Sequence, residues 1–260
     1  MNQDPYYLPP ELSSFSFIPR FDECIDNLAE LAEPEDWDYK NTTSPKPKPI
    51  LRNYINYTYK RIAEEKKVAV SEDEQYACWN TGLITLNHEP IFILFERNKL
   101  DNLPSYWHFG RFVRKGQWEL NKFSSLPEMA HYFDDSSCLV YNSRRELRSN
   151  IEHIIEENKQ RFPLEFQNRS SYSLQNSLKG AIDSAIERVK RNYKTAIPQY
   201  YNGNIQLLLP LCLDEPTKAD LALVIDNFND FYRASTCLTL DMAYNNARQI
   251  TRPDREWLKP

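Results

Sequence analysis

Apolar residues recur along the chain in two patterns, which divide it into predicted helices and predicted strands. Spacings of three and four place apolar side chains on one face of a helix, whereas short continuous or alternating apolar runs are typical of strands. The helical pattern covers residues 22–32, 51–66, 143–162, 173–193 and 241–251. The strand pattern covers residues 76–86, 90–97, 106–113, 117–120, 205–213, 221–225 and 232–240.

The order of these segments indicates the fold class. Strands come first, then two long helices, then strands and a last helix, which differs from the regular alternation of α/β proteins. We therefore predict an α+β fold, with antiparallel or mixed sheets packed against three to four amphipathic helices. Residues 1–50 are expected to form an acidic, proline-containing N-terminal arm, closed by the extended spacer SPKPKP at 44–49. Residues 51–260 are expected to form a single domain.

Composition narrows the class of protein. A hydrophobic fraction of 41% is ample for a packed interior, yet no run of about 18 apolar residues occurs, so we expect no membrane partner. The five cysteines form no CxxC pair and are odd in number. We read them as reduced and structural, which favours a cytoplasmic protein.

Charge is distributed unevenly. Residues 1–50 hold ten acidic against four basic residues, a charge of −6, which leaves +1 for residues 51–260 of a chain whose net charge is −5. A nearly neutral body does not attract nucleic acid by itself, so any such binding must come from a local patch.

Several common sites are absent from the sequence. The chain has only five glycines, and neither GxGxxG nor GxxxxGK[ST] can be written with them. The four histidines fall in different predicted elements, without HExxH or a cysteine pair. We therefore expect no metal site and no bound cofactor.

Three predicted helices each carry an asparagine on the apolar stripe. Asn158 follows Ile151, Ile154 and Ile155 at helical spacing, and Asn192 and Asn246 occupy similar positions on the next helix and the last helix. A buried amide without partners costs about 1–3 kcal/mol, so each of them needs a partner in the protein or on a ligand. One interpretation is that the three asparagines tie the helices to loops and strand ends. The other is that they line a shared polar cavity.

Basic and aromatic residues near these asparagines extend the second interpretation. Arg191 and Lys194 lie in a cationic, tyrosine-rich stretch at 188–201 that includes Tyr200, a mixture suited to nucleotides or single-stranded nucleic acid. The same residues also fit a helix end with ordinary dipole compensation. The other predicted ligand-binding residues are Asn158, Arg161, Asn192, Asn245, Asn246 and Arg248. If the protein is catalytic, His153 or Lys194 is the predicted acid or base.

Four segments resemble a known family. They are WNTGLIT at 79–85, HIIEENKQRFP at 153–163, IPQYYNGNIQLLLPLCL at 197–213 and LTLDMAYNNARQITRPDREWL at 238–258. They are similar to the bacterial family catalogued as domain of unknown function 3825, and the resemblance covers roughly residues 50–258. It implies that the chain is mostly one domain, and such domains are associated with RNA-binding modules such as cold-shock folds. It assigns no role to any residue.

Two functions are consistent with the sequence. The first is a nucleotide- or RNA-directed protein, with metal-independent catalysis on a phosphate- or nucleoside-containing ligand left open, that uses an Asn-, Arg- and Tyr-lined pocket. The alternative is a non-catalytic interaction module that binds a protein partner through its aromatic strands and the proline-rich N-terminal arm.

Overall fold

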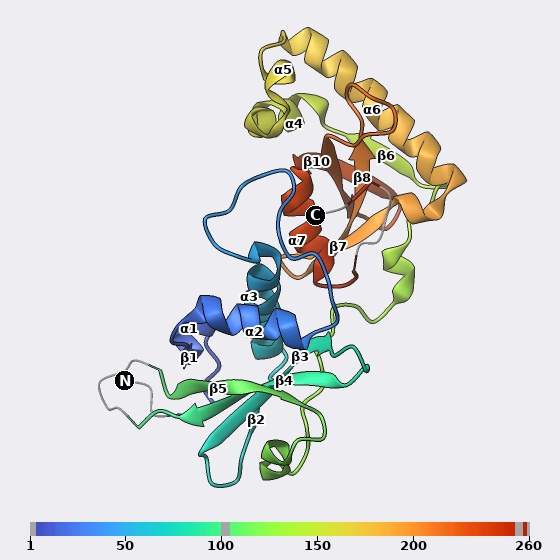
Figure 1. The fold of residues 1–260 in the computed structure, drawn as a ribbon. Coiled ribbons are helices and arrows are strands. Elements are labelled where there is room, and N and C mark those ends of the chain that lie inside the picture. Colours follow the sequence, from blue (N-terminus) through green and yellow to red (C-terminus); the bar gives the residue numbers. More distant parts are fainter. Residues whose placement is uncertain (1–3, 100–104, 253–256, 259–260) are drawn as a thin grey trace. The chain divides into compact units, whose positions relative to one another are not determined.

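The computed structural model describes residues 4–99, 105–252 and 257–258 (Figure 1). Two five-stranded sheets, each containing parallel and antiparallel pairs, combine with helices, so the predicted α+β class is confirmed. The described residues form seven α-helices, five of them with eight or more residues, which exceeds the predicted three to four.

Contacts divide the chain into two compact units. The N-terminal unit comprises the residues up to 38 and residues 44–131, and the C-terminal unit comprises residues 39–43 and the residues from 132 onward. The boundary expected near residue 50 therefore lies inside the N-terminal unit. The residues expected to form an arm are part of its core, because Leu12, Phe15, Ile25 and Leu28 are all buried.

The N-terminal sheet has the order β1-β5-β4-β3-β2, and β1 pairs parallel with β5. The strands are β1 (Ser16–Phe17), β2 (Ala69–Val70), β3 (Tyr76–Ile84), β4 (Pro90–Arg97) and β5 (Trp107–Arg114). Helices α1 (Leu12–Phe15), α2 (Phe21–Leu31) and α3 (Pro49–Glu64) belong to the same unit. Phe15 of α1 packs edge-on against Phe95 with ring centroids 5.2 Å apart, and Tyr59 of α3 packs against Trp79 at 5.9 Å.

The strand predicted at 117–120 is wrong. Gln117 precedes the 3₁₀ helix η1 (Trp118–Lys122), and the other three residues lie within it. Leu120 and Phe123 both belong to a hydrophobic cluster with Phe92 and Val113 of the N-terminal sheet. A spacing of three places them on one side of a single 3₁₀ turn, which an extended strand would not do.

The C-terminal sheet has the order β6-β10-β9-β8-β7, with one parallel pair, β6 with β10. The strands are β6 (Glu146–Ser149), β7 (Ile197–Tyr201), β8 (Asn204–Leu211), β9 (Leu221–Asn227) and β10 (Phe231–Leu238). The predicted helix at 143–162 therefore begins later than expected, as α4 (Ile151–Asn158). Asn150 ends the strand and caps the helix, since its Oδ1 accepts a hydrogen bond from the backbone N–H of His153.

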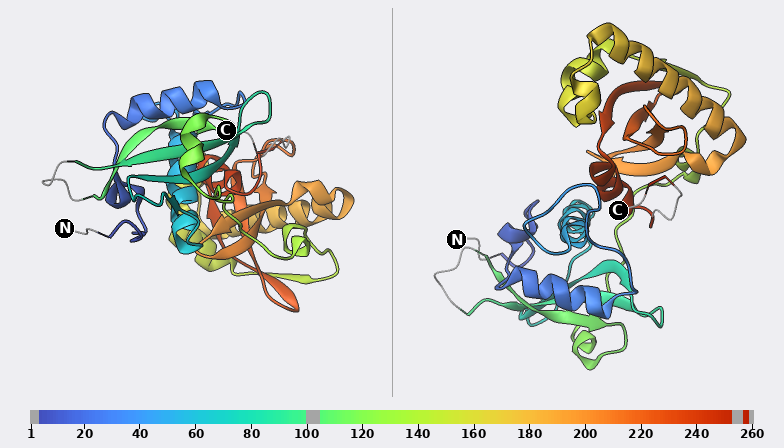
Figure 2. Two further views of the ribbon diagram at one scale, coloured as in Figure 1. Left: turned by 90° about the horizontal axis from the view of Figure 1, so that it is seen from below. Right: turned by 45° about the horizontal axis from the view of Figure 1, so that its top comes forward.

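The two faces of the C-terminal sheet carry different helices (Figures 1 and 2). Helices α4 and α6 (Ser171–Arg191) share one hydrophobic core with Leu207, Leu223 and Ala234, which defines the α6 face of the sheet. Helix α7 (Leu240–Arg248) packs against β7, β9 and β10. The face that α7 partly covers is called the α7 face below. Short helices α5 (Leu164–Gln167), η2 (Ser136–Leu139), η3 (Lys159–Arg161) and η4 (Tyr193–Thr195) complete the unit.

Residues 39–43, called the strap below, are held on α7. Asn41 Nδ2 and Thr42 Oγ1 each donate a hydrogen bond of 2.8 Å to the buried carboxylate of Asp241, and Asn245 Nδ2 donates to the hydroxyl of Tyr39. The C-terminal sheet and helices are thus completed by a segment that precedes them by about ninety residues in the chain. Within the described residues, no helix is both long enough and apolar enough to cross a membrane.

Candidate functional site

The α7 face carries a line of polar side chains that crosses all five strands. Strand register places Gln199, Gln206, Asp226, Arg233 and Arg148 next to one another on β7, β8, β9, β10 and β6 respectively. These five residues are called the polar row below. Because paired residues of neighbouring strands project from the same face, a register of this kind creates one continuous polar surface.

Part of the polar row is a chain of hydrogen-bonded amides. Asn246 Nδ2 on α7 donates to Gln199 Oε1 at 3.2 Å, Gln199 Nε2 donates to Gln206 Oε1 at 2.7 Å, and Gln206 Nε2 donates to Asp226 Oδ1 at 2.7 Å. A carboxylate only accepts hydrogen bonds, so Asp226 dictates the orientation of Gln206 and, through it, of Gln199 and Asn246. The amides are therefore held in one arrangement.

Burial decreases along the polar row. The side chain of Gln199 is buried beside α7, Gln206 and Asp226 are half-buried, and Arg233 and Arg148 are exposed. Within the described part of the chain, the guanidinium of Arg233 has no hydrogen-bonding or ionic partner. One end of the row is Gln199, whose side-chain amide is hydrogen-bonded within the protein. The other end, formed by Arg233 and Arg148, is exposed and cationic, and is called the open end below.

Aromatic rings flank the open end. The guanidinium carbon of Arg148 lies 4.2 Å from the ring centroid of Phe231, and Arg148 Nε is paired with Glu146 at 2.8 Å. The ring of Phe228 stacks on that of Phe231, with centroids 5.0 Å apart and planes at 6°. On the opposite edge strand, Tyr201 is two residues beyond Gln199 and is 52% exposed. The open end therefore combines cations with the exposed ring of Phe228, and Tyr201 adds a second exposed ring near the other end of the row.

The three asparagines predicted to point inward have different environments. Asn158 is buried as predicted, but its amide is satisfied by the protein: Nδ2 donates to Ile154 O, and Oδ1 accepts from Arg161 and Thr236. Asn192 is exposed, so its predicted inward position is wrong. Helix α6 ends at Arg191, and Asn192 has an extended backbone and caps η4 through its Oδ1.

The two asparagines of α7 are also distinguished by the structure. Asn246 is half-buried and begins the amide chain, whereas Asn245 is buried and donates to Tyr39 of the strap. The sequence predicted an apolar stripe of Met242, Ala243 and Ile250 around Asn246. In the structure Ala243, Tyr244 and Ala247 lie on the buried side of α7, whereas Met242 is 40% exposed. Arg248, on the last turn of α7, is half-buried.

The cationic residues predicted for one pocket occupy separate places. Arg161 Nη1 donates to Asn158 and to the carbonyl of Cys237, both at 2.6 Å, and so binds α4 to β10. Arg191 is exposed, lies 3.9 Å from Glu187 and borders a hollow of about 570 Å³ beside α6. Lys194 is exposed and borders a hollow of about 290 Å³ at the start of β7.

The two residues predicted as alternative acids or bases, His153 and Lys194, lie on separate features of the C-terminal unit. The side chain of His153 is exposed on the first turn of α4, which packs on the α6 face, and it does not line the hollow beside Lys194. Tyr200 is buried against Tyr132, with ring centroids 4.8 Å apart, and its neighbour Tyr201 supplies the exposed ring. Tyr201 and the polar row were missed because register is not visible in the sequence.

The cysteines fit the predicted structural role. Burial raises the pKa of all five thiols, to about 12 for Cys237, so they are protonated at neutral pH. Protonated thiols are poor nucleophiles. Among the residues that the structure describes, no three His, Cys, Asp or Glu side chains converge as metal ligands do.

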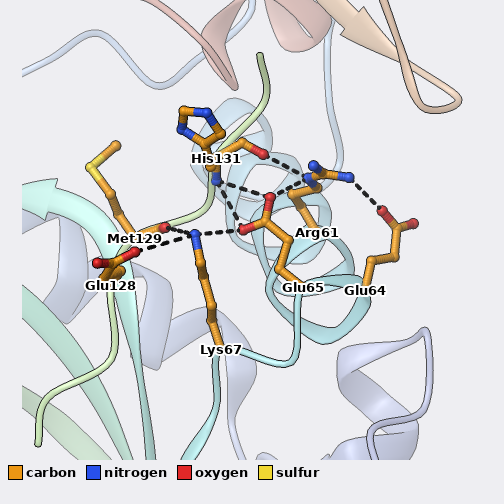
Figure 3. Close-up of polar contacts among 7 residues, drawn as sticks. All are labelled: Arg61, Glu64, Glu65, Lys67, Glu128, Met129 and His131. Atoms are coloured by element: carbon orange, nitrogen blue, oxygen red, sulfur yellow. Dashed lines mark hydrogen bonds and ion pairs between the residues drawn. The ribbon is translucent and has the colours of Figure 1, made fainter. Parts of the chain in front are cut away.

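A second polar cluster lies in the N-terminal unit, where α3 ends (Figure 3). Glu65 accepts hydrogen bonds or ion pairs from Arg61 Nε at 2.7 Å, Lys67 Nζ at 2.9 Å and the backbone N–H of His131 at 3.0 Å. Lys67 also donates to the carbonyl of Met129. The charges are mutually satisfied, so this cluster fastens residues 129–131 to α3.

The chain is therefore a two-unit α+β protein with a polar, partly open sheet face in its C-terminal unit. Residues 28–257 match the family Domain of unknown function (DUF3825), and the chain belongs to that family. No curated protein and no solved structure matches it.

Proposed function

We propose that the C-terminal unit binds a single-stranded nucleic acid on the open end of the α7 face. The observation that carries the proposal is Arg233, an exposed guanidinium without a side-chain partner in the described chain, set between Asp226 and Arg148 in the polar row. Each feature of this surface matches one part of a nucleotide.

The phosphate would be held by Arg233 and Arg148. Guanidinium groups bind phosphate through paired, charge-assisted hydrogen bonds, and they are hydrated more weakly than an ammonium group. Arg148 is already positioned by the ring of Phe231, so less conformational entropy is lost when it binds. The carboxylate of Glu146 competes for Arg148, which leaves Arg233 as the stronger contact.

The bases would stack on aromatic rings that lie beside the polar row. Tyr201 on the edge strand β7 and the Phe228–Phe231 pair at the turn between β9 and β10 lie on the same side of the row, with strand β8 between them. Stacking on an aromatic ring contributes about 1–3 kcal/mol per base and tolerates any base. Such an arrangement favours splayed, unpaired bases over a duplex.

The protein-interaction alternative has less support. It relied on a free proline-rich arm, whereas residues 12–31 pack in the N-terminal unit and Asn41 and Thr42 are bonded to Asp241. Neither His153 nor Lys194, the two residues predicted as alternative acids or bases, is part of the polar row. We therefore propose that the site binds single-stranded nucleic acid, and we propose no reaction for it.

The proposal is tested by the salt dependence of binding. Fluorescence anisotropy would follow a labelled nine-nucleotide uridine RNA, and a DNA of the same length, as they bind the full-length chain. The double variant Arg148→Ala/Arg233→Ala should bind more weakly. If each arginine neutralises one phosphate, the slope of log affinity against log salt should also decrease by about 1.4.

A matched control removes the same charge elsewhere in the unit. Lys179 and Lys190 are exposed on α6, which packs on the other face of the sheet. Lys179→Ala/Lys190→Ala should leave both affinity and slope near those of the wild type. Equal losses in the two double variants would indicate a general charge effect and would contradict the proposed site.

A further inference from the structure

The chain of hydrogen-bonded amides ends at Asp226, where some hydrogen-bonding groups have no partner among the described residues. Asp226 Oδ1 accepts from Gln206, while Oδ2 has no hydrogen-bonding partner among the described residues. Gln206 Nε2 uses one of its two hydrogens in this bond, so its second hydrogen is available. Asp226 and Gln206 are both half-buried, and they face the same side of the sheet.

From this pattern we infer that Asp226 selects guanine among the bases of the bound nucleic acid. The inference rests on the proposed function and adds the base that the site recognises. A carboxylate offers two adjacent acceptors, and the Watson–Crick edge of guanine offers two adjacent donors, N1–H and the N2 amino group. The free hydrogen of Gln206 Nε2 is a donor suited to guanine O6.

The other bases are less complementary to the same groups. Adenine presents the acceptor N1 beside its N6 amino group, and cytosine presents the acceptor N3 beside its N4 amino group. Uracil has a single donor, N3–H, between two carbonyl oxygens. Each of these bases would place an acceptor against the Asp226 carboxylate and leave an unpaired, partly desolvated oxygen.

The amide chain adds rigidity to this selection. An isolated glutamine can exchange the positions of its amide oxygen and nitrogen by rotation and so accept either kind of partner. Here Gln206 Oε1 is occupied by Gln199 Nε2, and Gln199 Oε1 is occupied by Asn246 Nδ2. Gln206 is therefore held with its nitrogen toward Asp226, and the donor and acceptor pattern of the surface is fixed.

The test compares guanosine with inosine, which lacks only the N2 amino group. Nine-nucleotide uridine RNAs would carry guanosine, inosine, adenosine or cytidine at the central position, and affinities would be measured by anisotropy with the full-length chain. Because a bidentate pair discriminates against bases that cannot form it, guanosine should bind about tenfold more tightly than inosine or adenosine. Guanosine monophosphate, added as a competitor, would show whether the base is also recognised as a free nucleotide.

Asp226→Asn should reduce the guanosine-to-inosine ratio toward one. Removing a negative charge raises affinity for every oligonucleotide, so the ratio is the measured quantity rather than the affinity itself. Asp230→Asn, which removes an exposed carboxylate three residues after Asn227, should keep the wild-type ratio.

The possible outcomes separate this inference from the proposed function. If the uridine RNA does not bind at all, the proposed function fails. If it binds with equal affinity for guanosine and inosine in the wild type, or if Asp226→Asn keeps the full ratio, the nucleic-acid site stands and guanine selection is overturned.

Discussion

Asn246 is the residue at which helix α7 is joined to the polar row. Its Nδ2 donates to Oε1 of Gln199, whose side chain is only 1% exposed. Replacement by alanine would leave that oxygen buried without its donor. Asn246→Ala should therefore lower the free energy of unfolding by about 1–3 kcal/mol, measured by urea denaturation.

Met242 provides the control for this substitution. It lies on the same helix and is 40% exposed, so Met242→Ala should change the free energy of unfolding by less than the asparagine variant does. Wild-type stability of Asn246→Ala would show that water replaces the amide, and the side chain would then be available to a ligand.

Glu65 gives the N-terminal unit a predicted dependence on pH. Partial burial raises the pKa of the carboxyl, but the hydrogen bonds from Lys67 and from the backbone of His131, together with the charges of Arg61 and Lys67, outweigh it and hold the pKa below its usual value. A group with a lowered folded-state pKa stabilises the fold above its unfolded pKa, and this stabilisation is lost as pH falls through the folded value. Glu65→Gln should therefore be less stable than the wild type at pH 7.

The difference between these two proteins should shrink as the pH is lowered past the ordinary pKa of a glutamate and through the lowered pKa of folded Glu65, because the wild-type carboxyl then takes up its proton. Glu64, the preceding residue, is paired with Arg61 at 3.3 Å but has a side chain that is 46% exposed. Glu64→Gln should show a much smaller effect at pH 7. A stability difference for Glu65→Gln that stays constant from pH 7 to pH 3 would show that the substitution acts by packing and not by charge.

At the scale of the elements, helix α7 depends on a distant segment of chain, the strap. Asp241 is 4% exposed, and its carboxylate accepts hydrogen bonds from Asn41 and Thr42 of the strap. Hydrogen bonds to a charged group contribute about 1.5–3 kcal/mol each, and a buried charge without partners is unfavourable. Asn41→Ala/Thr42→Ala should therefore destabilise the chain by at least about 1.5 kcal/mol in thermal or urea unfolding.

The effect should depend on Asp241. In an Asp241→Ala background, removal of Asn41 and Thr42 leaves no buried charge, so the loss on truncating the strap should be much smaller. Equal losses in both backgrounds would show that the strap stabilises α7 through backbone packing and not through the carboxylate.

The elements that the sequence predicted well are those set by local pattern. Helices α2, α3 and α6 begin and end within two residues of the predicted ranges, because the apolar spacing of each helix is visible within its own segment. Strand β6 was missed, since residues 146–149 become a strand only by pairing with β10, more than eighty residues later. The buried side of α7 was also predicted incorrectly, because packing against the sheet determines which side of the helix is buried.

At the scale of the whole molecule, the α+β class was predictable and the division into two units was not. The sequence showed polyproline spacing at 44–49 but could not show that residues 39–43 belong to the C-terminal unit. The candidate site was predictable only at Asn246, because Gln199, Gln206, Asp226, Arg233 and Arg148 become neighbours through strand register. A shift of one residue in any strand would separate them.

The most direct test of the account is to find where single-stranded RNA contacts the chain. Ultraviolet crosslinking of the full-length protein to a uridine RNA, followed by mass spectrometry of the digested complex, identifies the contacting peptides. The account predicts crosslinks at Tyr201 and at Phe228 or Phe231, with intensities that fall in Arg148→Ala/Arg233→Ala. Crosslinks confined to the N-terminal unit or to α6, with none on these strands, would contradict it.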